Sequence, residues 1–166
     1  MNTVPSESTA KLEQERKEIL NAFRGLMRAL KDRNKEETKL IRKAFDVALD
    51  AHKEMRRKSG EPYIYHPIAV ARICAEEMGL GPISVICALL HDTVEDTHIT
   101  LGDIEDIFGI KVRLIIDGLT KIPDVFDENA SIQAENFRKM ILTISEDFRV
   151  VLIKLSDRLH NMRTLG

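Results

Sequence analysis

The chain has 166 residues, of which 43% are hydrophobic, enough to build one buried core. Its formal net charge of −2 argues against a broad nucleic-acid-binding surface. We find no signal peptide and no apolar run of 18 residues, so no membrane association is expected. Cys74 and Cys87 lie in apolar segments without a CxxC pattern, as is typical of reduced core thiols in a cytoplasmic protein.

The N-terminal segment, residues 1–34, predicts an extension that is partly helical. Residues 8–32 are rich in charge but place apolar side chains at helical spacing between Ile19 and Leu30. We expect this helix to pack on the rest of the domain or on a partner chain, which makes it a candidate surface for self-association.

The domain itself is expected to span residues 35–166. Asn34 and Glu37 form a capping-box pattern, which predicts a helix from about residue 35 to residue 56. The buried stripe of this helix is expected to consist of Leu40, Ala44, Val47, Ala48 and Ala51.

Gly and Pro residues interrupt the chain after this helix. Residues 57–62 predict a loop, and the aromatic segment 63–65 is expected to be extended. Pro67 suits the first turn of a helix, so the next helix is expected over residues 66–78.

An apolar helix opened by Pro82 is then expected to carry His91 and Asp92 at its end. With these two residues, Glu95 and Asp96 complete a cluster of ionisable side chains that is costly to bury without a metal or a counter-charge. In a helix, the three carboxylates share one face. An imidazole and a carboxylate at this position suit a divalent metal, with acid–base groups beside it. A solvated acidic helix end is the alternative interpretation.

Further helices are expected in the last third of the chain. Thr100 is a typical N-cap and Gly109 a typical C-cap, and together they predict a helix over residues 101–108. Another helix is expected over residues 111–119.

The end of the chain combines a loop, expected over residues 120–131, with helices over residues 131–145 and 148–165. The last of these begins with a β-branched apolar run that resembles a strand. However, Asp157 and Asn161 follow at helical spacing and favour one long helix. Because we find no partner strand, the predicted fold class is all-α, an irregular helical bundle.

Four residues of metal-ligating types, each beside hydrophobic sequence, occur in the order H…HD…D. This order resembles that of the HD-domain metal-dependent phosphohydrolases. Longer motifs narrow the resemblance to the N-terminal hydrolase domain of the RelA/SpoT family, whose enzymes make and degrade the alarmone (p)ppGpp. The residues that carry the resemblance are His66, His91, Asp92 and Asp157, with the motifs RKSGEPYI from Arg57, HDTVEDT from His91, QAENFRKM from Gln133 and LSDRLHNMRTL from Leu155.

The resemblance implies a reaction and a role for each matched residue. The implied enzyme removes the 3′-pyrophosphate of (p)ppGpp, giving GDP or GTP and pyrophosphate, with one Mn²⁺ ion as cofactor. Nitrogen and oxygen ligands without a thiolate also suit Mn²⁺ better than structural Zn²⁺. The implied metal ligands are His66, His91, Asp92 and Asp157, the implied water-activating pair is Glu95 and Asp96, and the implied nucleotide-binding residues are Arg57, Lys58, Ser59, Asn161 and Thr164.

Other polar residues are expected to have lesser roles. His52 and His98 are expected at the surface. His160 is expected to support the site or the core rather than to ligate a metal. Arg138 and Lys139 suit substrate phosphates and an ordinary helix surface equally well.

The family's hydrolase domain continues beyond the equivalent of Gly166, so this bundle is expected to lack its last helices. Long family members add a synthetase domain with GTP pyrophosphokinase activity and regulatory domains, whereas short members have the hydrolase alone. The sequence is compatible with both. Two other functions stay open: an HD phosphohydrolase that acts on another nucleotide, and a non-catalytic regulatory domain that binds the alarmone.

Overall fold

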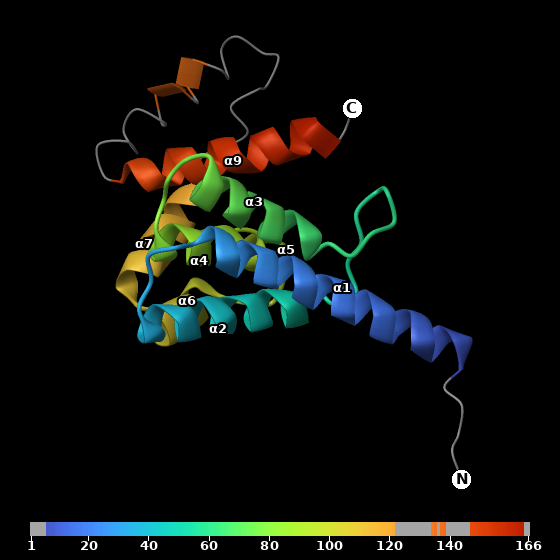
Figure 1. Ribbon diagram of the computed structural model, residues 1–166. Coiled ribbons are helices and arrows are strands. Elements are labelled where there is room, and N and C mark those ends of the chain that lie inside the picture. Colours follow the sequence, from blue (N-terminus) through green and yellow to red (C-terminus); the bar gives the residue numbers. More distant parts are fainter. Residues whose placement is uncertain (1–5, 122–133, 136, 139–146, 165–166) are drawn as a thin grey trace.

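The computed structural model describes residues 6–121, 134–135, 137–138 and 147–164. Within these ranges the regular structure is helical, apart from one isolated bridge between Arg56 and Pro62, which confirms the all-α class. None of the described helices is long and apolar enough to cross a membrane. The helices are α1 (Glu7–Ala29), α2 (Lys35–Ala51), α3 (Tyr65–Glu76), α4 (Pro82–Leu90), α5 (Thr93–Asp96), α6 (Leu101–Phe108), α7 (Ile110–Lys121) and α9 (Phe148–Thr164) (Figure 1).

Helix α4 is the centre of the bundle. Every residue from Ser84 to Leu90 is buried, as expected of a helix that is apolar on all sides. Helices α2, α3, α7 and α9 all pack against it. Its first turn contains Pro82, as predicted, and its last turn opens onto the stretch with His91 and Asp92. The core therefore ends where the ionisable residues begin.

Helix α1 packs on the domain, mainly along α3 (Figure 1). Its buried face includes Ile19 and Phe23, and the Phe23 ring stacks on Phe45 of α2 with centroids 4.3 Å apart. Of the two packing arrangements considered for this helix, contact with the rest of the chain is therefore observed.

Local capping signals predicted several helix ends correctly. The Asn34 side chain accepts a hydrogen bond from the Glu37 amide at 2.8 Å, and the Glu37 carboxylate accepts one from the Asn34 amide at 2.9 Å. Helix α6 lies between its predicted caps, Thr100 and Gly109. Gly109 has a φ of 94°, a left-handed conformation that favours glycine.

Helix α2 ends at Ala51, five residues before the predicted end. The chain after it folds back on itself instead of continuing the helix. The Arg57 amide donates to the Glu61 carbonyl at 2.9 Å, and the Tyr63 amide donates to the Met55 carbonyl at 3.0 Å. These backbone groups are therefore not available for helical hydrogen bonds, and residues 55–63 form a closed loop.

The buried stripe of α2 is also rotated from the predicted one. Ala44 and Ala48 are buried as predicted, and Ile41 and Phe45 are buried as well. Leu40 and Val47, which were also predicted to be buried, are only partly buried. Ala51 is only partly buried. The stripe follows the contacts of α2 with α4, which the helical spacing alone does not specify.

Two predictions near the site were wrong in local conformation. Residues Tyr63 and Ile64 form a turn rather than an extended segment, because the His66 amide donates to the Tyr63 carbonyl at 2.9 Å. In addition, no single helix carries His91 and Asp92. His91 is the C-cap of α4 and Asp92 is the N-cap of α5, so the two lie at a junction between helices.

Helix α9 is one continuous helix, as predicted, and lies across α3 and α7 at one side of the bundle (Figure 1). Its buried residues include Val150, Ile153 and Ser156. The predicted loop over residues 120–131 and helix over residues 131–145 lie largely outside the described residues. The packing of α9 on α3 is what carries its polar half to the site.

Candidate metal centre and its cavity

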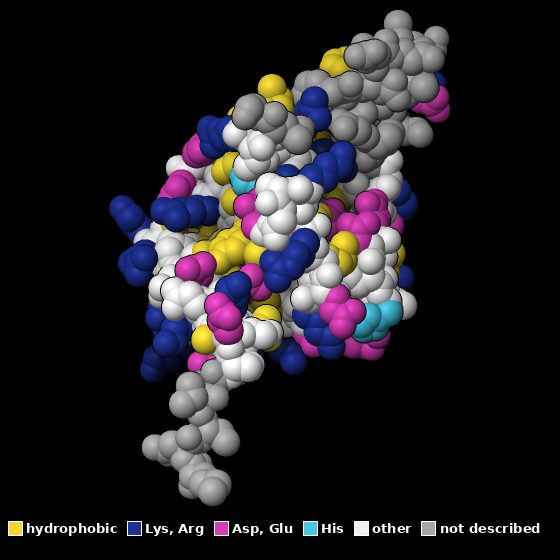
Figure 2. Space-filling model, turned by 90° about the vertical axis from the view of Figure 1, so that its right-hand side faces the viewer, with side chains coloured by type: hydrophobic (Ala, Val, Ile, Leu, Met, Phe, Trp, Pro, Cys, Tyr) yellow, Lys and Arg dark blue, Asp and Glu magenta, His cyan; other side chains and the backbone are white. Residues whose placement is uncertain are grey.

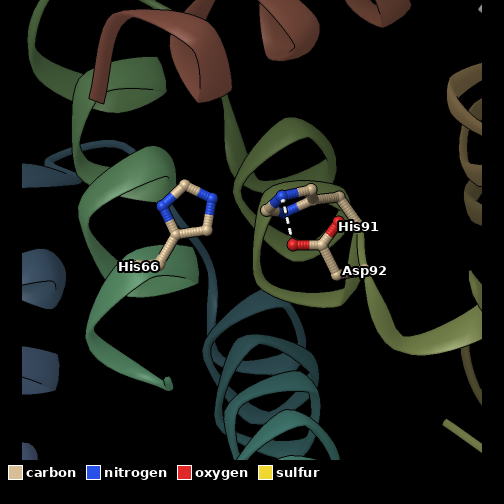
Figure 3. A group of neighbouring side chains, drawn as sticks. All are labelled: His66, His91 and Asp92. Carbon is tan, nitrogen blue, oxygen red and sulfur yellow. Dashed lines mark ion pairs between the residues drawn. The ribbon is translucent and has the colours of Figure 1, made fainter. Parts of the chain in front are cut away.

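Three side chains meet where α3 begins and α4 ends (Figure 3). His66 comes from the first turn of α3, and His91 and Asp92 come from the junction of α4 and α5. One potential ligand atom of each lies within 4.8 Å of the others. Because α3 packs closely on α4, residues 25 positions apart in the chain converge on one point.

Helix α9 adds a fourth side chain to this cluster. Asp157 Oδ1 lies 2.6 Å from His66 Nε2 and 3.3 Å from His91 Nε2. The structure thus brings together all four residues that the sequence analysis assigned to metal ligation, from three separate parts of the chain.

The side chains of the cluster stabilise one another in their charged forms. Burial of the Asp92 carboxyl raises its pKa, but His91 and the Tyr63 hydroxyl that donates to it outweigh burial and hold the pKa at about 2. Burial acts in the same way on Asp157, and the interactions of its carboxylate with His66 and His91 lower its pKa overall. Burial lowers the pKa of His91, yet the two carboxylates outweigh it and raise that pKa well above its ordinary value. The cluster is therefore a buried site that stabilises positive charge.

The arrangement around His91 fits a divalent cation. Its Nδ1 lies 2.6 Å from the Ala88 carbonyl, which assigns the ring proton to Nδ1 when the ring is neutral. Nε2 is buried and has no hydrogen-bond partner in the described part of the chain, although Asp92 Oδ2 lies 2.9 Å away. A proton on Nε2 or a metal ion bound there can relieve the contact between these atoms, and metal binding releases such a proton. Imidazole and carboxylate donors without a thiolate suit a divalent cation with mixed nitrogen and oxygen ligands.

A cavity of about 680 Å³ opens beside the cluster. Loop residues 55–63 form one wall and the end of α9 forms another. Arg57 connects the two walls, because its Nη2 donates to Asn161 Oδ1 at 3.1 Å and to Thr164 Oγ1 at 3.4 Å. The lining residues are Arg56, Arg57, Lys58, Ser59, Tyr63, His66, Asp92, Asp157, Asn161 and Thr164. All five residues implied in nucleotide binding thus face the same cavity as three of the metal-ligand candidates.

The loop is held from outside the cavity by α1. Arg56 Nη1 donates to the Gly60 carbonyl at 2.9 Å, and Arg56 Nη2 pairs with Glu15 Oε1 at 3.0 Å. Gly60 has a φ of 94°, which allows the sharp turn at the tip. Lys and Arg side chains are numerous on the face that carries this loop and the start of α1, with Asp and Glu between them (Figure 2).

Glu95 and Asp96 are exposed on the short helix α5 and do not line this cavity. Asp96 lies one turn after Asp92, and its amide donates to the Asp92 carbonyl at 3.0 Å. Although both residues are exposed, partial desolvation of their carboxyls raises their pKa values, and the charge of Asp92 raises them further, while Lys154 opposes the shift at Glu95. A raised carboxyl pKa brings these groups closer to the range in which general bases work.

One residue beside the cluster contradicts the sequence-based expectation, and two others make contacts that the sequence did not specify. His52, expected at the surface, is 3% exposed, and its ring packs 4.7 Å from that of Tyr63. The Tyr63 hydroxyl, which donates to Asp92, was not assigned a role; its position beside the loop motif is the signal that could have identified it. His160 lies against His66, with 2.7 Å between their Nδ1 atoms. Burial, together with the nearby His66 and Arg57, lowers the pKa of His160 to about 4.

The remaining expectations concern the surface. His98 is exposed, as predicted. Arg138 is exposed as well, and Lys139 lies outside the described residues.

Comparisons with known proteins agree with this geometry. The model of the HD domain family matches residues 44–166. The bifunctional (p)ppGpp synthase/hydrolase SpoT of Escherichia coli is 51% identical over 132 residues, which are 79% of this chain and 19% of that protein. The GTP pyrophosphokinase rsh of Brucella melitensis is 48% identical over 129 residues, which are 76% of this chain and 17% of that protein. The chain thus spans about a fifth of the length of the curated relatives it matches.

A solved structure is similar to this chain in three dimensions. It is described as a metazoan ortholog of SpoT that hydrolyzes ppGpp and plays a role in starvation responses. It superposes with a TM-score of 0.60 at 29% sequence identity, over 76% of this chain and 70% of that one.

Proposed function

The chain belongs to the HD domain family, and on this premise we propose that it is a Mn²⁺-dependent (p)ppGpp 3′-pyrophosphohydrolase. Its products would be pyrophosphate and either GDP or GTP. One observation carries the proposal: a buried cluster of metal-ligating side chains and a basic loop face one cavity. The relative from Escherichia coli, whose name includes (p)ppGpp hydrolysis, supports the choice of substrate.

We propose that the nucleotide binds between the loop and the end of α9. The Arg57 guanidinium can stack flat on a purine ring, and Lys58 adds a positive charge for the phosphates. Asn161 and Thr164 offer hydrogen-bonding groups on the opposite wall. Because Arg57 already connects these residues to the loop, the two walls are pre-arranged for a ligand that contacts both.

The metal would be held by His66, His91, Asp92 and Asp157. A divalent ion in such a site polarises a phosphoryl oxygen and lowers the pKa of water.

Glu95 and Asp96 supply the acid–base chemistry in this proposal. Either carboxylate can accept the proton of the attacking water, an effect typically worth about 10²- to 10⁴-fold in rate. Their raised pKa values and their distance of one helical turn from Asp92 support this role. The water oxygen attacks the phosphorus atom that is bonded to the ribose 3′-oxygen. The bond between this phosphorus and the 3′-oxygen breaks, pyrophosphate is released, and the 3′-oxygen takes up a proton.

Incubation of ppGpp with the purified protein and Mn²⁺ tests the proposal directly. We expect release of pyrophosphate and GDP in equal amounts, and loss of that release when EDTA removes the metal. Tight binding of ppGpp to the Mn²⁺-loaded protein without any release would contradict hydrolysis and would favour an alarmone-binding regulatory domain. Turnover of other nucleotides but not of ppGpp would point to a different substrate.

Two sets of variants separate metal binding from proton transfer. We expect Glu95→Gln combined with Asp96→Asn to retain Mn²⁺ and to lose at least about 10²-fold in hydrolysis, because the proton acceptors are removed. Asp92→Ala and His66→Ala are expected to lose the metal itself. Metal analysis of each variant, alongside pyrophosphate release, makes the comparison. An acidic-pair variant that hydrolyses ppGpp normally would disprove the assigned role.

We further propose a cytoplasmic location, since both cysteines are buried and free, as is usual where thiols stay reduced. GTP pyrophosphokinase activity, which the name of the Brucella relative states, is proposed only for a longer protein that would contain this chain.

A further inference from the structure

We propose that His160 is a positioning residue for the metal site: it accepts a hydrogen bond from Nδ1 of His66 and thereby orients Nε2 of that ring toward the cation. This inference rests on the metal site of the proposed function and not on the identity of the substrate.

The geometry of the two rings is that of a direct hydrogen bond. His66 on α3 and His160 on α9 approach with their Nδ1 atoms 2.7 Å apart. Their ring centroids are 4.9 Å apart, and the ring planes are inclined by 32°. His66 is 2% exposed, so water cannot readily replace this partner.

The direction of the hydrogen bond follows from what a metal ligand requires. A nitrogen that binds a cation must present its lone pair, and a neutral imidazole then carries its proton on the other nitrogen. In His66 the nitrogen on the side of His91 and Asp92 is Nε2 (Figure 3). This nitrogen lies 2.6 Å from Asp157 Oδ1. The proton therefore belongs on Nδ1, and the nearest acceptor is Nδ1 of His160.

The two histidines of the cluster are oriented in different ways. His91 has the Ala88 backbone carbonyl beside its Nδ1, and no side-chain substitution removes that partner. His66 depends instead on a side chain. Helix α9 supplies both Asp157 and His160, three residues apart and therefore on one face. A single helix thus provides a candidate ligand and the group that orients another.

Binding of Mn²⁺ to the metal-free protein, measured by calorimetry without nucleotide, tests this inference. His160→Leu removes the acceptor and is expected to weaken Mn²⁺ binding about 10- to 100-fold, the usual cost of losing the partner of a ligating histidine. His160→Asn has nearly the same shape as leucine but places Oδ1 where Nδ1 was. We expect it to bind Mn²⁺ almost as tightly as the unchanged protein.

The pair of variants makes the result decisive. Unchanged Mn²⁺ affinity in His160→Leu would overturn the inference, and so would an equal loss in both variants, because shape rather than the acceptor would then matter. If leucine disturbs the packing of α9, as thermal unfolding of the metal-free protein would show, His160→Met is a more flexible apolar substitute with the same expected loss. Since no nucleotide is present, failure of ppGpp hydrolysis alone would contradict the proposed function and leave this inference standing.

Discussion

Tyr63 contacts both the aromatic rings and a carboxylate of the candidate site. Its hydroxyl donates to Asp92, and its ring packs near the rings of both His52 and His66. Burial raises the pKa of Tyr63, and the negative charge of Asp92 raises it further, so the phenol stays protonated and remains a donor. A neutral donor of this kind stabilises the carboxylate without adding charge to the metal site.

Substitution of Tyr63→Phe removes this donor and keeps the ring. We expect Mn²⁺ affinity to fall by about 10-fold, since a hydrogen bond to a charged group contributes roughly 1.5–3 kcal/mol and some of it is recovered by water. Titration of the metal-free protein with Mn²⁺ measures the change. Tyr65→Phe, which alters a partly buried tyrosine two residues away, is the matched control and should bind the metal normally. Equal affinities of the two variants would show that the Tyr63 hydroxyl does not support Asp92.

At the scale of secondary-structure elements, the junctions between helices matter more than the helices. Three of the four metal-ligand candidates lie at the start of α3 and between α4 and α5, where side chains leave the close-packed core, and the fourth, Asp157, lies within α9. The loop between α2 and α3 is shaped by backbone hydrogen bonds and by Arg56, which joins it to Glu15 of α1. The N-terminal helix is therefore connected to the wall of the proposed nucleotide site.

This connection predicts an effect on substrate affinity. Glu15→Gln removes the charge that holds Arg56, and we expect the KM for ppGpp to rise by about two- to fivefold with kcat unchanged. The effect is small because a partly exposed ion pair contributes only about 0.2–1 kcal/mol. Steady-state kinetics at low and high salt measure it, and the difference should shrink at high salt, where such pairs are screened. Glu13→Gln removes the same charge from an exposed position of α1 and should leave the KM unchanged.

A lower kcat in Glu15→Gln, with an unchanged KM, would contradict this account. It would show that α1 affects the reacting groups themselves rather than the loop.

At the scale of the whole molecule, the proposed metal site joins parts of the chain that are distant in sequence. His66 and Asp157 are in contact although 91 positions separate them, and the helices that carry them pack together. A cation bound by both would therefore stabilise the packing of α3 against α9. Any ligand that binds only the folded state raises the free energy of unfolding.

Removal of the metal should lower the melting temperature. With Mn²⁺ at about 100 times its Kd, the gain is about 2.7 kcal/mol, which corresponds to roughly 5–10 °C for a chain of this size. Thermal unfolding followed by circular dichroism, in Mn²⁺ and in EDTA, measures the shift. Asp157→Asn keeps the shape of the side chain but weakens the site, so its melting temperature should respond little to Mn²⁺. A shift of the same size in this variant would exclude Asp157 as a ligand.

Features that depend on residues a few positions apart could be predicted from the sequence. The caps at Asn34, Thr100 and Gly109 are of this kind, as is Pro82 in the first turn of α4. Their hydrogen bonds and dihedral preferences act within one or two helical turns. A short stretch of sequence is therefore enough to predict these helix ends. The all-α class follows from the same local signals, and the order of motifs identified the residue types of the site.

Features that depend on contacts between distant parts of the chain could not be predicted in this way. The early end of α2, the rotation of its buried face and the break between His91 and Asp92 all follow from packing and from the closed loop. The contact of Tyr63 with Asp92 spans 29 positions, and that of His66 with His160 spans 94. Helical periodicity assigns a side chain to a face but cannot say which other helix that face will meet. For this reason the sequence indicated the candidate ligands, whereas the side chains that contact them became visible only when α3, α4 and α9 were packed together.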